Sequence, residues 1–175
     1  MDAAHFVHGT YRCCLWALVR VFVRAASGRR RSNVLGAWDA VARRLLSVTN
    51  TAVVNTDTMC QLLRRIAAEN RAGPVTLVLD NARYQRSKVV QGLAAELSIR
   101  LLYLPSYSPN LNLIERLWGF AKRTAVYGRY HPDVASFRAA IEATLAGIPT
   151  THAAKLASLM TLDFQTFEDV SLLAG

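Results

Sequence analysis

Two short apolar runs frame the middle of the chain. Val75–Leu79 has the length and composition of a buried strand and is followed at once by Asp80, and Ile99–Leu104 is a second run of the same kind. Between them, Ser87 is placed to cap a helix. The apolar positions of this helix are Val89, Val90, Leu93, Ala94 and Leu97. Strand, helix and strand predict a right-handed parallel crossover, which leaves Asp80 at the carboxyl end of its strand, where open α/β sheets keep their sites.

A third amphipathic segment follows a turn over residues 105–110. Pro109 and Asn110 are helix-start signals, and the apolar period of a half-buried helix continues from there. Its apolar positions are Leu111, Ile114, Leu117, Trp118 and Ala121. Glu115 and Lys122 are seven residues apart, so they share one helix face about 10 Å apart along the axis. A carboxylate at a strand end and another at a helix start form the layout of a metal site.

The first third of the chain reads as strands. Residues 14–23 predict a strand, residues 24–31 a basic turn and residues 33–38 a returning strand. Residues 45–54 predict another short strand, and either Asn55 or Thr56 caps the helix that follows. Arg29, Arg30 and Arg31 in the turn are candidates for contact with phosphate, although a solvated hairpin tip explains them about as well.

The last third reads as helical. A turn over residues 127–132 precedes a helix over 134–145, and residues 151–160 predict another helix. We therefore expect one main domain over residues 1–150 and a helical tail over residues 151–175, packed on the body or on a partner subunit.

Composition limits the classes of protein that fit. The 175 residues are 52% hydrophobic, enough for a real core, and the formal net charge of +9 favours a polyanionic partner. Nucleic acid is the first candidate and an anionic membrane surface the second. The three cysteines, Cys13, Cys14 and Cys60, lack metal-ligand spacing and predict reduced thiols. No apolar stretch reaches the ~20 residues of a membrane span, and no signal peptide is visible, so we expect a cytoplasmic protein.

A specific motif surrounds the two acids. Asp80-Asn-Ala-Arg and Leu104-Pro-Ser-Tyr-Ser-Pro-Asn-Leu-Asn-Leu-Ile-Glu-Arg-Leu-Trp118 occur in this order, with 34 residues between Asp80 and Glu115. Together they closely resemble the end of the catalytic core in mariner-type DDE transposases, in the bacterial insertion-sequence branch. The resemblance covers nearly the whole chain. It implies an RNase H-like, retroviral-integrase-like α/β fold, a mixed sheet of an antiparallel meander plus parallel strands with helices on both faces.

The same resemblance makes Asp2 the first acid of the triad. In the family this aspartate ends the first, central strand and is followed by small or apolar residues and His-Phe, as in Asp2-Ala-Ala-His-Phe6. The strand ahead of Asp2 and the family's helix-turn-helix domains are then missing from this chain. Two positions depart from the family pattern. Gln85 stands where the family often has His and cannot titrate, and Leu113 stands where it often has Pro, a change we expect to be harmless.

The resemblance implies metal-dependent DNA cleavage at element ends and strand transfer into target DNA. Two Mg²⁺ or Mn²⁺ ions are expected, because two hard cations stabilise both the attacking and the leaving oxygen, and carboxylates are their preferred ligands. We expect Asp80 to bridge the ions, with Asp2 and Glu115 each binding one. Further candidates for contact with phosphate are Arg83, Arg116, Lys122 and Arg123. Double-stranded DNA and a homodimer on it are the expected partners.

Several alternatives stay open at this stage. Asp39 and Asp57 are rival carboxylates. The chain is either active or an inactive truncated transposase remnant, whose neighbouring strands would have exposed edges. A plain nucleic-acid-binding fragment explains the charge but not the three acids. A nuclease of the same fold that cleaves RNA–DNA hybrids fits the transposase motif poorly.

Overall fold

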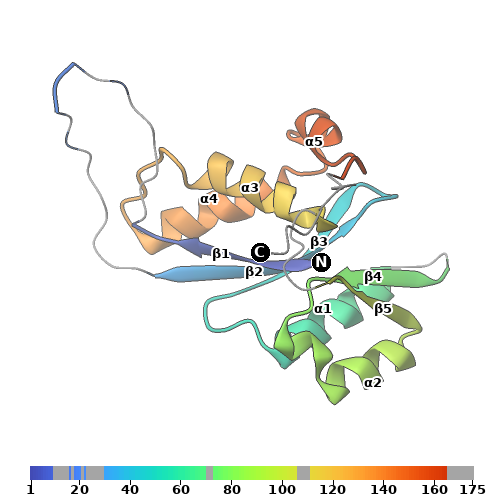
Figure 1. Cartoon of the computed structure of the whole chain (residues 1–175). Helices are drawn as coiled ribbons and strands as arrows, with labels where there is room; N and C mark the ends of the chain where they lie inside the picture. The colour runs from blue at the N-terminus through green and yellow to red at the C-terminus, as the bar shows by residue number, and fades with distance from the viewer. Residues whose placement is uncertain are drawn as a thin grey trace, which may run out of the picture.

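The computed structural model describes residues 1–9, 16, 18–20, 22, 30–69, 73–105 and 111–164. These residues form an α/β body in which strands lie between helices on both sides (Figure 1). The elements in chain order are β1 (Asp2–Val7), β2 (Arg31–Asp39), β3 (Arg44–Asn50), α1 (Thr56–Glu69), β4 (Val75–Leu79), the 3₁₀ turn η1 (Arg83–Arg86), α2 (Lys88–Glu96), β5 (Ile99–Tyr103), α3 (Ile114–Ala125), α4 (Val134–Ala146) and α5 (Ala153–Leu159).

The strands form two sheets. β1, β2 and β3 make an antiparallel meander in which Asp2 lies opposite Gly36, and β4 and β5 pair in parallel. An antiparallel meander and the predicted parallel crossover are therefore both present, but the first strand of the meander is residues 2–7. A hydrogen bond joins the two sheets, from the amino group of Met1 to the carbonyl oxygen of Val78, at 2.7 Å. The carboxyl end of β4 thus lies beside the start of β1.

Asp2 opens β1, so the strand at this acid is formed by the residues that follow it. The returning strand over residues 33–38 is present as β2, but its partner is β1 and not a strand over residues 14–23. Within that segment the described residues lie outside regular secondary structure, and their apolar side chains are exposed. Those residues are Trp16, Leu18, Val19, Arg20 and Phe22. The remaining residues of the segment, with Cys13 and Cys14, lie outside the described part.

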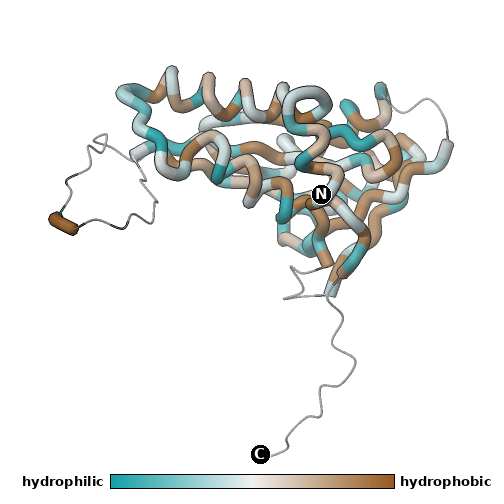
Figure 2. The backbone as a smooth tube through the Cα atoms, turned by 90° about the horizontal axis from the view of Figure 1, so that it is seen from above, coloured by the Kyte–Doolittle hydropathy of each residue, from teal (hydrophilic) through white to brown (hydrophobic). Residues whose placement is uncertain are grey.

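Each face of the meander buries its own apolar cluster. Successive side chains of a strand point to opposite faces, and on β2 Val34 joins α3 and α4 while Leu35 joins α1. Figure 1 shows α3 and α4 on one side of β1–β3, with α1 and α2 on the other. Along the helices of Figure 2 hydrophobic and hydrophilic residues alternate, as amphipathic helices require. Two separate cores therefore hold the elements that carry the acids.

The structure shows which residues cap the first turns of α1 and α2. Asn55, not Thr56, accepts the backbone N–H of Thr58 at the start of α1, and Ser87 accepts that of Val90 at the start of α2. Val89 was expected to point inward but is 65% exposed. Among the described helices none is long and apolar enough to cross a bilayer.

Candidate functional site

Asp80 lies where the sequence places it, directly after the last residue of β4. The parallel pairing of β4 and β5 continues one residue past β5, through a hydrogen bond from Leu104 N to Leu79 O at 2.8 Å. Asn81 then takes a left-handed backbone with φ of 74°, a conformation that asparagine tolerates better than most residues. The chain therefore turns sharply after Asp80, and η1 begins three residues after this acid.

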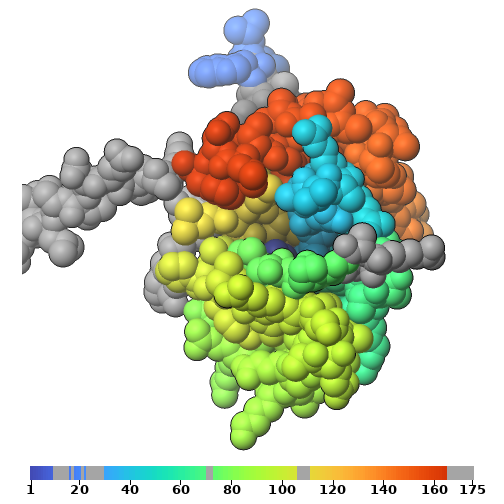
Figure 3. All heavy atoms as spheres, turned by 90° about the vertical axis from the view of Figure 1, so that its right-hand side faces the viewer, coloured from blue at the N-terminus to red at the C-terminus, as the bar shows by residue number. Residues whose placement is uncertain are grey.

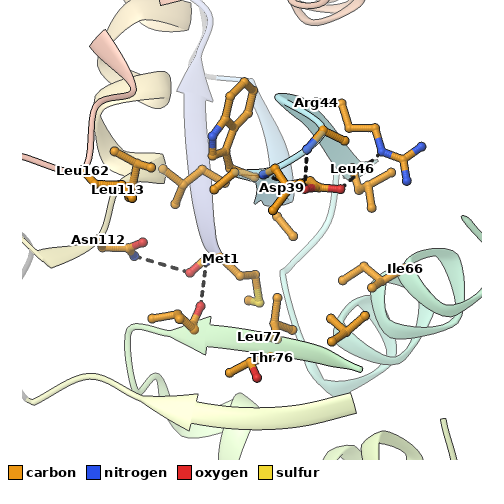
Figure 4. Close-up of a pocket in the computed structure, with 18 of the residues that line it drawn as sticks. Met1, Asp39, Arg44, Leu46, Ile66, Thr76, Leu77, Asn112, Leu113 and Leu162 are labelled. Atoms are coloured by element: carbon orange, nitrogen blue, oxygen red, sulfur yellow. Dashed lines mark hydrogen bonds and ion pairs between the residues drawn. The ribbon is translucent and has the colours of Figure 1, made fainter. Parts of the chain in front are cut away.

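Asp2 lies at the start of β1, in the antiparallel sheet, beside the carboxyl end of β4. Met1 precedes it and lies between β4 and the start of α3 in Figure 4. The amino group of Met1 donates to Val78, and its carbonyl oxygen accepts from the buried Asn112 Nδ2 at 3.4 Å. The carboxylate of Asp2 accepts the backbone N–H of Ala3 at 2.6 Å. The backbone next to Asp2 is therefore fixed by contacts with two other elements.

Glu115 is supplied by α3. Leu113 precedes the first residue of this helix in a helical conformation, so the departure from proline has no visible cost. Ile114, Leu117 and Trp118 are buried against the meander, and Glu115 itself is exposed in the first turn. The bond of Asn112 to Met1 places it at the junction between β1 and the start of α3. Residues 106–110 of the predicted turn lie outside the described part of the chain.

The three acids influence one another electrostatically. The pKa of Asp2 is raised to about 6, mainly by burial and in part by the negative charges of Asp80 and Glu115, against the lowering effect of the Ala3 N–H. Burial also raises the pKa of Glu115, as does the charge of Asp80, whereas Lys122 lowers it. The helix-face prediction for Glu115 and Lys122 agrees with this coupling. Like charges gathered in this way are costly unless a cation neutralises them.

Tyr84 lies at the same site and was missed by the sequence analysis. Burial raises the pKa of its phenol to about 12, with smaller increases from the charges of Asp80 and Asp2. Its hydroxyl is 3.5 Å from Gln85 Nε2. No motif around Tyr84 signals this position, because its approach to Asp2 depends on how the two sheets meet.

The donor chemistry fits a hard divalent cation, since the site presents carboxylate oxygens from three elements. In the described ranges, however, no three His, Cys, Asp or Glu side chains stand close enough together to hold a metal ion as they are. Glu115 is exposed on a long rotatable side chain, so its carboxylate is the one with most freedom to move.

The two rival carboxylates have other roles. Asp39 accepts the backbone N–H groups of Val41 and Ala42 in the β2–β3 turn, and its other oxygen lies 3.6 Å from Arg44. Asp57 is exposed in the first turn of α1. Neither residue influences the pKa of Asp2 or of Glu115.

A cavity of about 800 Å³ adjoins the site. It is lined by backbone and side chains of β2 residues 37–39, β4 residues 75–78 and the start of α3, with Met1 at one end. Figure 3 shows the dark-blue N-terminal residues at the bottom of this hollow, between the β2–β3 hairpin and β4. The space therefore lies between β2 and β4, next to Met1.

The candidate phosphate contacts occupy different surroundings. Arg83 on η1 and Arg123 on α3 are exposed, and Lys122 is half-buried one turn before the end of α3. Arg30 is exposed, and Arg31 opens β2 opposite Val7, about 17 Å from Asp2 at the strand rise of about 3.4 Å per residue. Arg29 lies outside the described residues.

Arg116 has a clear structural role. Its guanidinium donates to the carbonyl oxygens of Leu159, Thr161 and Asp163 at 2.6–3.3 Å, and it lies 5.7 Å from the centre of the Phe164 ring. These contacts hold the segment after α5 against α3, and Leu156 of α5 is buried in the same cluster as α3 and α4.

Comparisons with known proteins agree with this arrangement. A family model described as DDE superfamily endonuclease matches residues 1–138. No curated protein sequence matches the chain. Among solved structures, the Mos1 transposase paired-end complex with the left transposon end superposes with a TM-score of 0.64 at 15% identity, covering 94% of this chain and 55% of that one.

Two further structures have the same fold. The catalytic domain of Mos1 mariner transposase gives a TM-score of 0.54 at 16% identity, covering 78% of this chain and 77% of the domain. A simian T-cell lymphotropic virus intasome in complex with PP2A regulatory subunit B56 gamma gives 0.52 at 19% identity, over 80% and 45%. The chain spans about half the length of the whole transposase that it matches.

The structural matches confirm the predicted RNase H-like fold class, since both the transposase and the intasome provide catalytic domains of that fold. The family match extends over the strand that begins at Asp2, over Asp80 and over the helix that carries Glu115. Because it covers well over half of the sequence, the chain belongs to the DDE superfamily of endonucleases.

Proposed function

We propose that the chain is the catalytic part of an insertion-sequence transposase of the bacterial branch, acting in the cytoplasm on double-stranded DNA. It would cleave DNA at the ends of the element and join the freed 3′ hydroxyl to target DNA. The observation that carries the proposal is the convergence of Asp2, Asp80 and Glu115, from two sheets and a helix, within range of one another's charge.

These three carboxylates are the proposed metal ligands. Asp80 would bridge two Mg²⁺ or Mn²⁺ ions, with Asp2 and Glu115 each holding one, and the ions would supply charge stabilisation for the oxygens on phosphorus. The Mos1 catalytic domain has been solved with Raltegravir and with Mg or Mn, which supports a divalent metal in this fold. The raised pKa of Asp2 supports the same role, because burial and the charges of Asp80 and Glu115 disfavour its ionised form, and a bound cation would favour that form.

The charge distribution supports DNA as the partner. The formal net charge is +9. The exposed Arg83 lies three residues after Asp80, and the exposed Arg123 lies on the helix that carries Glu115. We propose that these residues, Lys122 and residues 29–31 contact phosphates, while Arg116 holds the C-terminal segment in place. A homodimer on paired DNA ends is the proposed assembly. Mos1 structures solved as a paired-end complex and as a strand transfer complex support DNA binding.

We propose the domain division already expected from the sequence, a catalytic domain over residues 1–150 and a C-terminal tail over residues 151–175. The contacts of Arg116 with residues 159–163 support packing of this tail on the catalytic body of the same chain.

The proposal is tested by nicking of supercoiled plasmid DNA in Mn²⁺, which needs no knowledge of the terminal repeats. The wild-type chain should convert plasmid to the open circle, and Asp80→Asn and Glu115→Gln should each reduce the rate at least about 100-fold, in the range for loss of a group that stabilises transition-state charge. Glu96→Gln is the matched control, because Glu96 is an exposed acid at the end of α2.

Two outcomes would overturn the proposal. One is nicking that survives both acid substitutions, which would indicate a contaminating nuclease or another site. The other is salt-sensitive DNA binding by the wild-type chain with no cleavage in Mn²⁺ or Mg²⁺, which would favour the nucleic-acid-binding fragment.

A further inference from the structure

Gln85 is a buried polar residue in the core beside the site. Its exposed fraction is 0%, and it lies on η1, five residues after Asp80. The side-chain amide makes contacts in two directions. Oε1 accepts the backbone N–H of Ala82 at 3.0 Å, and Nε2 donates to Asp80 Oδ1 at 2.5 Å. A buried amide of this kind is retained only where its hydrogen bonds are made.

Chemistry fixes the orientation of this amide. The Ala82 N–H can only donate, so the atom facing it must be the amide oxygen. The nitrogen of Gln85 then necessarily faces Asp80, where a carboxylate oxygen is the natural acceptor. A flipped amide would place a donor against a donor and leave the carboxylate facing an oxygen, and both contacts would be lost.

The backbone of the turn is fixed as well. The hydroxyl of Tyr103, on the last residue of β5, donates to the carbonyl oxygen of Gln85 at 3.1 Å. The left-handed Asn81 brings the chain back so that Gln85 can face the strand end. Gln85 is thus held by a neighbouring strand and by its own turn, and its amide nitrogen donates to Asp80 at 2.5 Å and makes a longer contact of 3.5 Å with the Tyr84 hydroxyl.

We propose that Gln85 is the positioning residue for Asp80, engaging Oδ1 so that Oδ2 is the oxygen presented toward Asp2 and Glu115. The inference rests on the proposed function, since it takes Asp80 as a metal ligand. Partners that orient a ligand in this way are typically worth 10–100-fold in metal affinity. Glutamine performs this task without a proton that can be lost, so the orientation of Asp80 is the same at any pH at which the fold persists.

Mn²⁺ affinity of the full chain, measured from the electron paramagnetic resonance signal of free Mn²⁺ at about pH 8, tests the proposal. Gln85→Glu keeps the oxygen that accepts from Ala82 but replaces the donor, and Gln85→Met removes both groups at similar length. Each should weaken Mn²⁺ binding about 10–100-fold. Gln85→His, neutral at this pH, offers an acceptor and a donor on separate ring nitrogens and should restore affinity to within about threefold of wild type.

Asn55→Ala is the matched control. It removes the cap of α1 without touching Gln85 or its turn, so it should lower stability by about 1 kcal/mol and leave Mn²⁺ affinity unchanged. Asp80→Asn should abolish binding. If Asp80→Asn abolishes binding while the Glu and Met variants bind like wild type, this inference is overturned and the proposed function stands. If the wild-type chain binds no Mn²⁺, the proposed function fails, and this inference fails with it.

Discussion

Replacing Asp2 by Asn should stabilise the metal-free protein at alkaline pH. The carboxyl group of Asp2 has a pKa of about 6 in the fold against an ordinary value of 3.8. The folded state therefore binds its proton more tightly than the unfolded chain, and ionising the carboxyl costs folding energy. The stability that this protonated carboxyl contributes is fully present below about pH 4, is lost as the pH rises through about 6, and changes no further at higher pH. The gap of about 2 pH units, at 1.36 kcal/mol per unit, is worth about 3 kcal/mol.

Asparagine should recover most of this cost because it has the same shape and can still accept the Ala3 N–H. We expect Asp2→Asn to raise the free energy of unfolding by about 2–3 kcal/mol at about pH 8 and by less than about 1 kcal/mol at about pH 4. Urea unfolding at both pH values measures the difference. The Met1 amine has a pKa lowered by burial to about 6, so at the higher pH it is neutral in both folded proteins.

Asp57→Asn is the control, because it removes the same charge from an exposed first helical turn. Its free energy of unfolding should fall by about 0.3–1 kcal/mol, because the negative charge near the helix N-terminus is favourable to the helix dipole. Adding Mg²⁺ at about 100 times its dissociation constant should then stabilise the wild type alone, by about 2.7 kcal/mol, and cancel the advantage of Asp2→Asn. The reasoning would be refuted if Asp2→Asn were less stable than wild type at alkaline pH, or if its gain in free energy of unfolding were the same at both pH values.

Three further substitutions test how the site is held. Gly36→Ala places a Cβ 2.8 Å from the Trp118 ring and should lower the free energy of unfolding in urea by about 1–3 kcal/mol. Gly92→Ala, which has open space around it in α2, should raise the free energy of unfolding by about 0.5–1 kcal/mol. Equal effects of the two substitutions would contradict this packing. Arg116→Ala should speed limited proteolysis within residues 159–164 while changing DNA affinity less than Arg123→Ala does, and the reverse order would show that Arg116 is a DNA contact. Asn112→Ala should lower stability by about 1 kcal/mol and weaken Mn²⁺ binding, measured on the same samples, and unchanged binding would remove this residue from the positioning of α3.

The sequence predicts well wherever the pattern is local. The strand over Val75–Leu79, the cap at Ser87 and the buried face of α3 follow from spacing and capping chemistry alone, and the structure confirms them. The parallel crossover is confirmed for the same reason, since its two strands and its helix are consecutive in the chain.

Predictions that depend on distant partners were less accurate. The apolar run over residues 14–23 has strand composition, yet β2 pairs with residues 2–7, whose Ala4 and Phe6 lie in the cluster of α3 and α4. Gln85 was recognised as a departure from the family pattern, but its contact with Asp80 depends on the left-handed turn at Asn81, which no spacing rule predicts.

The site depends on both cores at once. Asp80 and Gln85 belong to the layer of β4, β5 and α2, whereas Glu115 is held by the cluster on the opposite face of the meander. The two layers meet at Met1, whose nitrogen bonds one and whose carbonyl oxygen bonds the other. A substitution deep in either core therefore shifts one acid relative to the other two. Because a cation relieves the repulsion among the three carboxylates, metal affinity should fall when a change in core packing moves one of them away from the others.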